Sequence, residues 1–284
     1  YNVMLACCQE GDEVIIPAPY WLSYPEMVKL AGGTPVIVQT TDTTEFKVTP
    51  DQLREAINDR TRIFILNSPS NPTGSVYTPE EIRALGDVCV DKGVLIMSDD
   101  IYEKLIYGDT KFQSVAACSP EHQEHTIIVH GLAKAYSMTG WRIGFTAAPL
   151  PIAKAIGAIQ SHSTSNPTSF AQVGAVQALE GPQDHLDMWL GEFNKRRSVA
   201  FDKLNAIDGI SCVNAQGAFY LFPNISSTGM KSAEFCERLL AEAKVAAVPG
   251  VAFGSDDYIR ISYATSMTNI EEALGRLEQF VRGL

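Results

Sequence analysis

The run GLAKAYSMTGWRIGF, residues 131–145, decides how this chain folds around its candidate site. An apolar stretch, Thr126–His130, precedes the run, and a second candidate strand, Arg142–Ala147, overlaps its end. Between the two strands a polar turn carries Lys134. In open α/β sheets ligands bind at the carboxyl ends of the strands. The position of Lys134 therefore makes it a candidate for a side chain that faces a ligand.

Further candidate strands lie upstream of this run and alternate with amphipathic helices. They are Glu13–Ile16, Pro35–Gln39, Arg62–Leu66 and Val94–Ser98. Two helices should begin at TPDQ, from Thr49, and at TPEE, from Thr78, because each has an N-cap threonine, a proline at the first position and a capping-box acceptor. This alternation predicts an α/β domain with a mostly parallel sheet covered by helices on both faces.

The last third of the chain has a different rhythm. A long helix is predicted over His185–Ile207, and helices are also predicted over Ser232–Glu242 and Asn269–Leu284. Short strands are expected at SCVN, AFYLF, AAVPG and YIRISYA, which begin at residues 211, 218, 246 and 258. We expect a large domain over 1–193 and a smaller α+β domain over 194–284, with the boundary near Asn194.

Composition excludes several classes of protein. The chain is 45% hydrophobic and 19% charged, and it contains no apolar run long enough to cross a bilayer, so no membrane partner is expected. A net charge of -11 opposes binding to nucleic acid. Six cysteines without a CxxC pair indicate reduced core residues of a cytoplasmic protein. The chain begins inside a helical pattern at Tyr1, so we expect the natural N-terminus to lie upstream.

Three segments concentrate polar side chains just after a strand. They are RIFILNSPSNPTG, VLIMSDDIYEKLIY and IIVHGLAKAYSMTGWRIGF, which begin at residues 62, 94 and 127. Each has an ordinary explanation by itself, as a Pro-Gly turn, a helix cap and a solvated lysine. Their coincidence at one sheet edge favours a shared reaction centre.

A lysine becomes a nucleophile when burial or a nearby cation lowers the pKa of its ammonium group, and Arg142 is close enough in sequence to contribute. Pyridoxal phosphate needs a carboxylate at its pyridine nitrogen, donors to its phenolate oxygen, an aromatic ring to stack on and a cation for its phosphate. The chain offers one candidate for each role, in that order: Asp99, Asn71 with Tyr102, Trp21 and Arg142.

These motifs resemble the class I, fold type I, pyridoxal-phosphate-dependent aminotransferases, and most closely the bacterial-type aspartate and prephenate aminotransferase subgroup. The resemblance covers almost the whole chain. It is carried by PYWLSYPEM, NSPSNPTG, SDDIYE, KAYSMTGWRIGF, STSNPTSFAQ, GAFYLF and YIRISYATS, which begin at residues 19, 67, 98, 134, 163, 217 and 258.

The resemblance implies a role for each matching residue. Lys134 would hold pyridoxal 5'-phosphate as a Schiff base and shuttle the proton, while Asp99 would pair with the pyridine nitrogen. Asn71 and Tyr102 would bond the phenolate oxygen. The remaining positions are Trp21 for ring stacking, Arg142 for the phosphate and Arg260 for the substrate α-carboxylate, which a guanidinium grips through two hydrogen bonds.

Structural explanations remain open for several of these residues. Trp21 could be a core or interface aromatic, Tyr102 a helix-face residue and Arg260 one half of a surface ion pair. Phe219 is expected to pack near the substrate pocket. His122 and His125 have a spacing compatible with a metal site, but no further ligands complete one, so we interpret them as part of a solvated loop with no metal bound.

Some positions depart from the family pattern. Ser161 stands where animal-type enzymes carry an arginine for the substrate side chain, Gly131 where a phosphate-binding serine is common, and His130 where asparagine is common. The family's glycine-rich phosphate turn and the groups that bind the substrate side chain would precede Tyr1.

The sequence thus predicts transamination from a dicarboxylic amino acid to a 2-oxo acid by a ping-pong mechanism, with aspartate and 2-oxoglutarate as the expected pair, in a homodimer that shares its active sites. Alternatives are a prephenate or aromatic aminotransferase or a carbon-sulfur β-lyase. A non-catalytic truncated fragment is the alternative from a different class.

Overall fold

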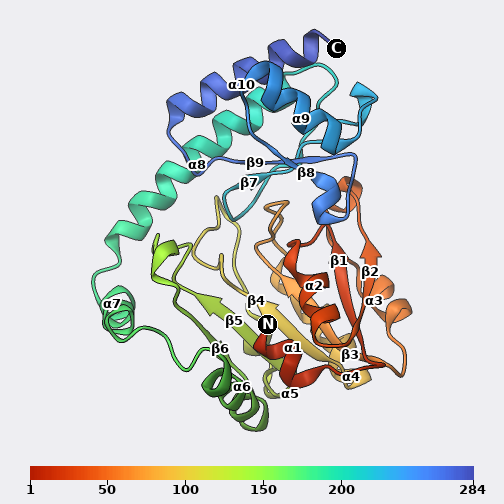
Figure 1. The fold of residues 1–284 in the computed structure, drawn as a ribbon, viewed down its shortest axis with the longest axis vertical. Helices are drawn as coiled ribbons and strands as arrows, with labels where there is room; N and C mark the ends of the chain where they lie inside the picture. Colours follow the sequence, from red (N-terminus) through yellow and green to blue (C-terminus); the bar gives the residue numbers. More distant parts are fainter.

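The six candidate strands of the N-terminal part form one sheet in the computed structural model, which describes residues 1–284. Its strands are β1 (Glu13–Ala18), β2 (Thr34–Gln39), β3 (Thr61–Asn67), β4 (Leu95–Asp99), β5 (Thr126–Gly131) and β6 (Gly144–Ala147). They lie in the order β2-β1-β3-β4-β5-β6, as Figure 1 shows. Neighbours from β2 to β5 run parallel, and β6 runs antiparallel to β5.

Both faces of this sheet are covered because successive strand side chains point to opposite sides. Ile15 packs in a core with α3 and α4, whereas its neighbours Val14 and Ile16 pack in a second core with α1, α2 and α6. The helices of this part are α1 (Asn2–Cys7), α2 (Ser23–Leu30), α3 (Pro50–Ala56), α4 (Pro79–Lys92), α5 (Pro120–His125), α6 (Leu150–Ser163) and α7 (Ser169–Glu180). The predicted mixed, mostly parallel sheet flanked by helices is confirmed.

Both predicted capping boxes are present. Thr49 accepts a hydrogen bond from the amide of Gln52, and Thr78 accepts one from the amide of Glu81, and in each case the N3 side chain bonds the threonine amide in return. These local hydrogen bonds satisfy amide groups that have no partner inside the helix. They explain why α3 and α4 begin where the sequence predicts.

The C-terminal part packs on a long helix, α8 (Asp184–Asn205), which leads out of the sheet region (Figure 1). A small sheet has the order β7-β9-β8, with strands β7 (Tyr220–Leu221), β8 (Val248–Pro249) and β9 (Ile259–Ser262). Helices α9 (Ser232–Ala243) and α10 (Met267–Arg282) enclose a core that contains Leu204, Phe235 and Leu274. We propose the domain boundary near Asn194, inside α8, because the helix residues beyond it, Ala200 and Leu204, are buried in this core.

Three local expectations are wrong. Ser211–Asn214 forms no strand, because only Ser211 pairs, through an isolated bridge to Asn224. Strand β6 begins at Gly144, since Arg142 has a left-handed backbone with φ 54° that ends the pairing. His122 and His125 lie in α5 rather than in a solvated loop, and His122 is buried between Ser119 and Asp87.

The two parts of the chain meet at the NPTG turn. Gly74 has a φ of +72°, and a Cβ at this position would overlap the Cβ of Ala215. The Gly74 carbonyl accepts hydrogen bonds from the amides of Gln216 and Gly217, both at 2.8 Å. Only glycine permits this backbone angle together with so close an approach.

None of the helices combines the length and the apolar character that a membrane span requires.

Candidate active site

A cavity of about 360 Å³ opens at the carboxyl ends of β3, β4 and β5. This volume lies in the range of small-molecule sites. The structure brings six of the seven predicted site residues to its wall, and the seventh, Arg260, bonds one of them. The six are Trp21, Asn71, Asp99, Tyr102, Lys134 and Arg142.

Asp99, the last residue of β4, lies in the wall of the cavity and is held from two sides. The Tyr24 hydroxyl donates to its Oδ2 at 2.6 Å, and the amide of Ile101 donates to its Oδ1 at 3.3 Å. Burial raises the pKa of Asp99, while the bond from Tyr24 works in the opposite direction. The two hydrogen bonds stabilise the ionised carboxylate of Asp99 at a position where desolvation disfavours a charge.

Lys134 lies in the turn after β5 and its amine is half-buried. Its Nζ is 5.8 Å from the ring centroids of both Tyr102 and Phe219. Burial, followed by the positive charges of Arg260 and Arg142, lowers the pKa of the Lys134 ammonium group, and Asp99 partly opposes this change. A lowered pKa increases the fraction of free amine, which is the nucleophilic form.

A chain of hydrogen bonds connects the two parts of the molecule across the cavity. Arg260 donates from Nη1 to Oδ1 of Asn71 at 2.8 Å, so the Asn71 amide group keeps its own donors for the cavity. The Asn71 backbone amide donates to Oδ1 of Asn67, and Asn67 donates to the carbonyl of Asp99. The buried Nε of Arg260 has no protein partner, which leaves one donor for a ligand.

Trp21 and Arg142 lie at the rim. Trp21 is 37% exposed and packs edge-on against Tyr24, with 5.3 Å between ring centroids. Arg142 is exposed and donates to the carbonyl of Thr139 at 3.0 Å. Its charge remains available to an anion in the cavity.

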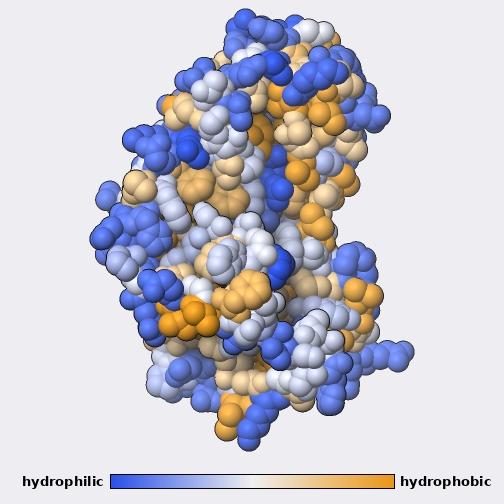
Figure 2. Space-filling view, turned by 60° about the vertical axis from the view of Figure 1, so that its left-hand side comes forward, coloured by the Kyte–Doolittle hydropathy of each residue, from blue (hydrophilic) through white to orange (hydrophobic).

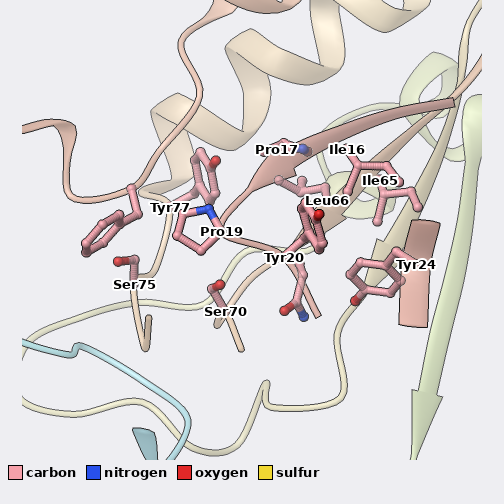
Figure 3. A pocket seen from close by; sticks show the side chains of 12 residues that line it. Ile16, Pro17, Pro19, Tyr20, Tyr24, Ile65, Leu66, Ser70, Ser75 and Tyr77 are labelled. Carbon is pink, nitrogen blue, oxygen red and sulfur yellow. The ribbon is translucent and has the colours of Figure 1, made fainter. Parts of the chain in front are cut away.

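A second, much smaller cavity lies behind Tyr24. Its volume is about 20 Å³, which is enough for one water molecule. Figure 3 shows Tyr20, Tyr24, Ser70 and Ser75 around it. The buried hydroxyl of Ser75 has no protein partner, so a water molecule is the group that fits there.

Sequence reasoning missed three residues of the site: Tyr24, Asn67 and Tyr220. Asn67 opens the NSPSNPTG motif, and Tyr24 follows Trp21 by three residues, a spacing that places both on one side of a helical turn. These signals existed, but neither shows that Tyr24 reaches Asp99. Tyr220 carried no signal beyond its place in GAFYLF.

The departures from the family pattern have structural explanations in two cases. A Cβ at Gly131 would lie 2.9 Å from the carbonyl oxygen of Ile143, so a serine does not fit beside β6. His130 lines the cavity, stacks on Phe145 with 5.2 Å between ring centroids, and has its Nε2 3.3 Å from Glu103. Ser161 lies exposed near the end of α6, outside the cavity.

No group of three or more His, Cys, Asp or Glu side chains is arranged to hold a metal ion. The fold and the cavity define an α/β protein whose site combines a lysine with a lowered pKa, a partly buried carboxylate and two arginines. Comparison with known proteins agrees with this class. The model of the family described as aminotransferase class I and II matches residues 1–277, and the chain belongs to this family.

Individual relatives match over nearly the whole chain. The aspartate aminotransferase of Geobacillus stearothermophilus is 52% identical over 286 residues, which cover 99% of this chain and 73% of the relative. The aspartate/prephenate aminotransferase of Cereibacter sphaeroides is 48% identical and covers 100% of this chain and 74% of the relative. The crystal structure of the aspartate aminotransferase from Rhizobium meliloti superimposes with a TM-score of 0.95 at 41% identity, covering 99% and 73%. Enzymes of this family depend on pyridoxal 5'-phosphate.

Proposed function

We propose that this protein transfers the amino group of aspartate to 2-oxoglutarate by a ping-pong mechanism. The observation that carries the proposal is the meeting of Lys134 and Asp99 in one cavity, with the lysine pKa lowered by burial and by two arginines. The names of the Geobacillus and Rhizobium relatives support aspartate as the donor.

The residues present fit pyridoxal phosphate. Asp99 would hold the pyridine nitrogen, and Asn71 and Tyr102 would donate to the phenolate oxygen. Trp21 would stack on the ring and Arg142 would bind the phosphate. When bound, the group supplies an electrophilic carbonyl carbon and an electron sink.

The chain's own side chains would then act on the substrate. The Lys134 amine would take the proton from the substrate Cα, because its lowered pKa increases the fraction of free base. Arg260 would bind the substrate α-carboxylate, and its unpartnered Nε provides the donor that completes a two-bond grip together with an Nη group.

The decisive experiment is to identify the lysine that binds the cofactor. After incubation with pyridoxal phosphate and reduction with borohydride, peptide mass spectrometry should place the added mass on Lys134. Lys134→Ala should show neither this mass nor the visible absorbance of bound cofactor, whereas Lys154→Ala, which alters an exposed lysine of α6, should keep both. Retention of both signals in Lys134→Ala would refute the assignment.

A second candidate substrate is prephenate, which the name of the Cereibacter relative supports. Absorbance changes of the loaded protein on addition of aspartate, an aromatic amino acid or a cysteine conjugate separate the aspartate, aromatic and β-lyase reactions. Pyruvate release from the cysteine conjugate would favour the lyase. A loaded protein unchanged by every donor would favour the non-catalytic alternative.

We also propose a cytoplasmic homodimer with shared sites. Figure 2 brings the side with α7 and α8 forward and shows hydrophobic residues exposed among hydrophilic ones. Four hydrophobic side chains of α7 are at least half exposed: Phe170, Val173, Val176 and Leu179. Exposed apolar surface of this kind is typical of protein contacts. Val173→Lys should lower the dimer fraction in sedimentation equilibrium, and an unchanged fraction would argue against α7 as part of the interface.

A further inference from the structure

Tyr220 lies beside the cavity and contacts two residues of the site, Arg260 and Tyr102. It lies on β7 in the C-terminal part and is only 6% exposed. The guanidinium carbon of Arg260 is 4.5 Å from the Tyr220 ring centroid and 5.0 Å from that of Phe253. Two aromatic rings therefore restrict the plane of the guanidinium, and cation–π attraction stabilises its charge at this site.

The hydroxyl of Tyr220 makes a second contact, 3.1 Å from the hydroxyl of Tyr102. Tyr102 follows β4 in the large sheet region, so this contact joins the two parts of the molecule directly at the cavity. Both hydroxyls are buried, and burial raises the pKa of each phenol, which keeps both protons in place.

Either hydroxyl can donate in this hydrogen bond, and the choice decides where the Tyr102 proton points. A tyrosine hydroxyl has one proton to donate and lone pairs to accept with. If Tyr102 donated to Tyr220, it would have no proton left for a ligand in the cavity. If Tyr220 donates, Tyr102 accepts that bond and directs its own proton into the cavity. A phenolate oxygen has no proton to give, so a Tyr102 hydroxyl that bonds one must donate to it and can then only accept from Tyr220.

We propose that Tyr220 is a positioning residue that sets two groups at once: its ring fixes the guanidinium of Arg260, and its hydroxyl directs the proton of Tyr102 into the cavity. The inference rests on the proposed function, because it assigns these two groups to the substrate carboxylate and the cofactor oxygen. It adds a link between the C-terminal part and the lysine-bearing sheet edge.

Two substitutions separate the two contacts. Tyr220→Phe keeps the ring under Arg260 and removes the donor to Tyr102. Tyr220→Leu removes both. Tyr263→Phe is the matched control, because Tyr263 is a fully buried tyrosine of the same region whose hydroxyl bonds the Ala218 carbonyl at 3.2 Å and lies outside the cavity.

The first measurement is a pH titration of the visible absorbance of protein loaded with pyridoxal phosphate. A hydrogen bond that Tyr102 donates to the cofactor oxygen would stabilise the unprotonated form of the lysine-bound group. Weakening this bond should move the midpoint of the absorbance titration to higher pH. We expect an upward shift of about half to one pH unit in Tyr220→Phe. The variant leaves unchanged the other charged groups around Tyr102 that affect this titration, which are Asp99, Lys134 and Arg260.

The second measurement is the dissociation constant of a dicarboxylate inhibitor. Tyr220→Phe should bind it within about twofold of the wild type, whereas Tyr220→Leu should bind about 3- to 30-fold more weakly because the cation–π contact is lost. Tyr263→Phe should leave both the titration and the inhibitor affinity unchanged.

The outcomes separate the inference from the function on which it rests. A wild-type protein that gains no visible absorbance would overturn both. A wild type that binds and titrates normally, together with a Tyr220→Phe titration that coincides with it, would overturn the hydroxyl role alone. Equal inhibitor affinity in Tyr220→Leu and wild type would overturn the role of the ring.

Discussion

Replacing Tyr24 by phenylalanine tests the electrostatics of the site most directly. The Tyr24 hydroxyl donates to Oδ2 of Asp99 at 2.6 Å, and Tyr24 is only 2% exposed. This bond favours the charged form of Asp99 and opposes the rise in pKa that burial causes. The Tyr24→Phe variant removes the donor, so the pKa of Asp99 should rise further.

The magnitude follows from the kind of bond. A hydrogen bond to a charged group contributes about 1.5–3 kcal/mol, and one pKa unit corresponds to about 1.4 kcal/mol. The pKa of Asp99 should therefore rise by about one to two units in Tyr24→Phe. Only the ionised carboxylate can pair with a protonated pyridine nitrogen, so cofactor affinity should decline as pH falls through the pKa of Asp99.

The assay is the dissociation constant of pyridoxal phosphate measured across the acid and neutral pH range. In Tyr24→Phe the decline in affinity should begin about one to two pH units higher than in the wild type. Tyr77→Phe is the control, since this buried tyrosine only accepts a neutral hydrogen bond from the Val48 amide at 2.9 Å. Coincident profiles for Tyr24→Phe and wild type would refute the argument.

Three further changes have defined outcomes. Burial raises the pKa of the Asp100 carboxyl from 3.8 to about 6, so the folded state binds this proton more tightly than the unfolded state does. As pH rises through this range the unfolded state loses the proton first, and the free energy of unfolding falls by about 3 kcal/mol by neutral pH. Urea unfolding of Asp100→Asn should lack this pH-dependent fall. Gly131→Ala should lower the free energy of unfolding by about 1–3 kcal/mol because its Cβ meets the β6 backbone, whereas Gly157→Ala, in open space on α6, should not destabilise. Arg260→Lys should weaken dicarboxylate binding about 10- to 100-fold in inhibition assays, with cofactor affinity retained, because lysine cannot form two parallel bonds.

Much of the fold could be predicted because its signals are local. The capping boxes at Thr49 and Thr78 depend on side chains three residues apart, and the strands depend on apolar runs of a few residues. The weak strand at Ser211 failed for the opposite reason. Its pairing with Asn224 depends on a neighbour brought by the tertiary fold, and only one residue pairs.

The site could be predicted in part. Asp99 ends a strand, and Asn71 and Lys134 each lie a few residues after one, so the rule that parallel strands end at a common edge brings the three together. Tyr24 and Tyr220 could not be found in this way. Tyr24 contacts Asp99, which is 75 residues away along the chain, and Tyr220 contacts Tyr102, which is 118 residues away.

The amino-acid sequence by itself determined the class of this protein, most of its element types and the lysine at the centre of its site, because periodicity, capping and motif spacing act over short distances. Only the tertiary structure decided the electrostatic state of that lysine, since its pKa depends on burial and on Arg260, which the chain brings back from a distant strand. It also decided which tyrosines surround the cavity. A side chain's pKa and partners depend on what the folded chain places around it, and this cannot be read from its neighbours in sequence.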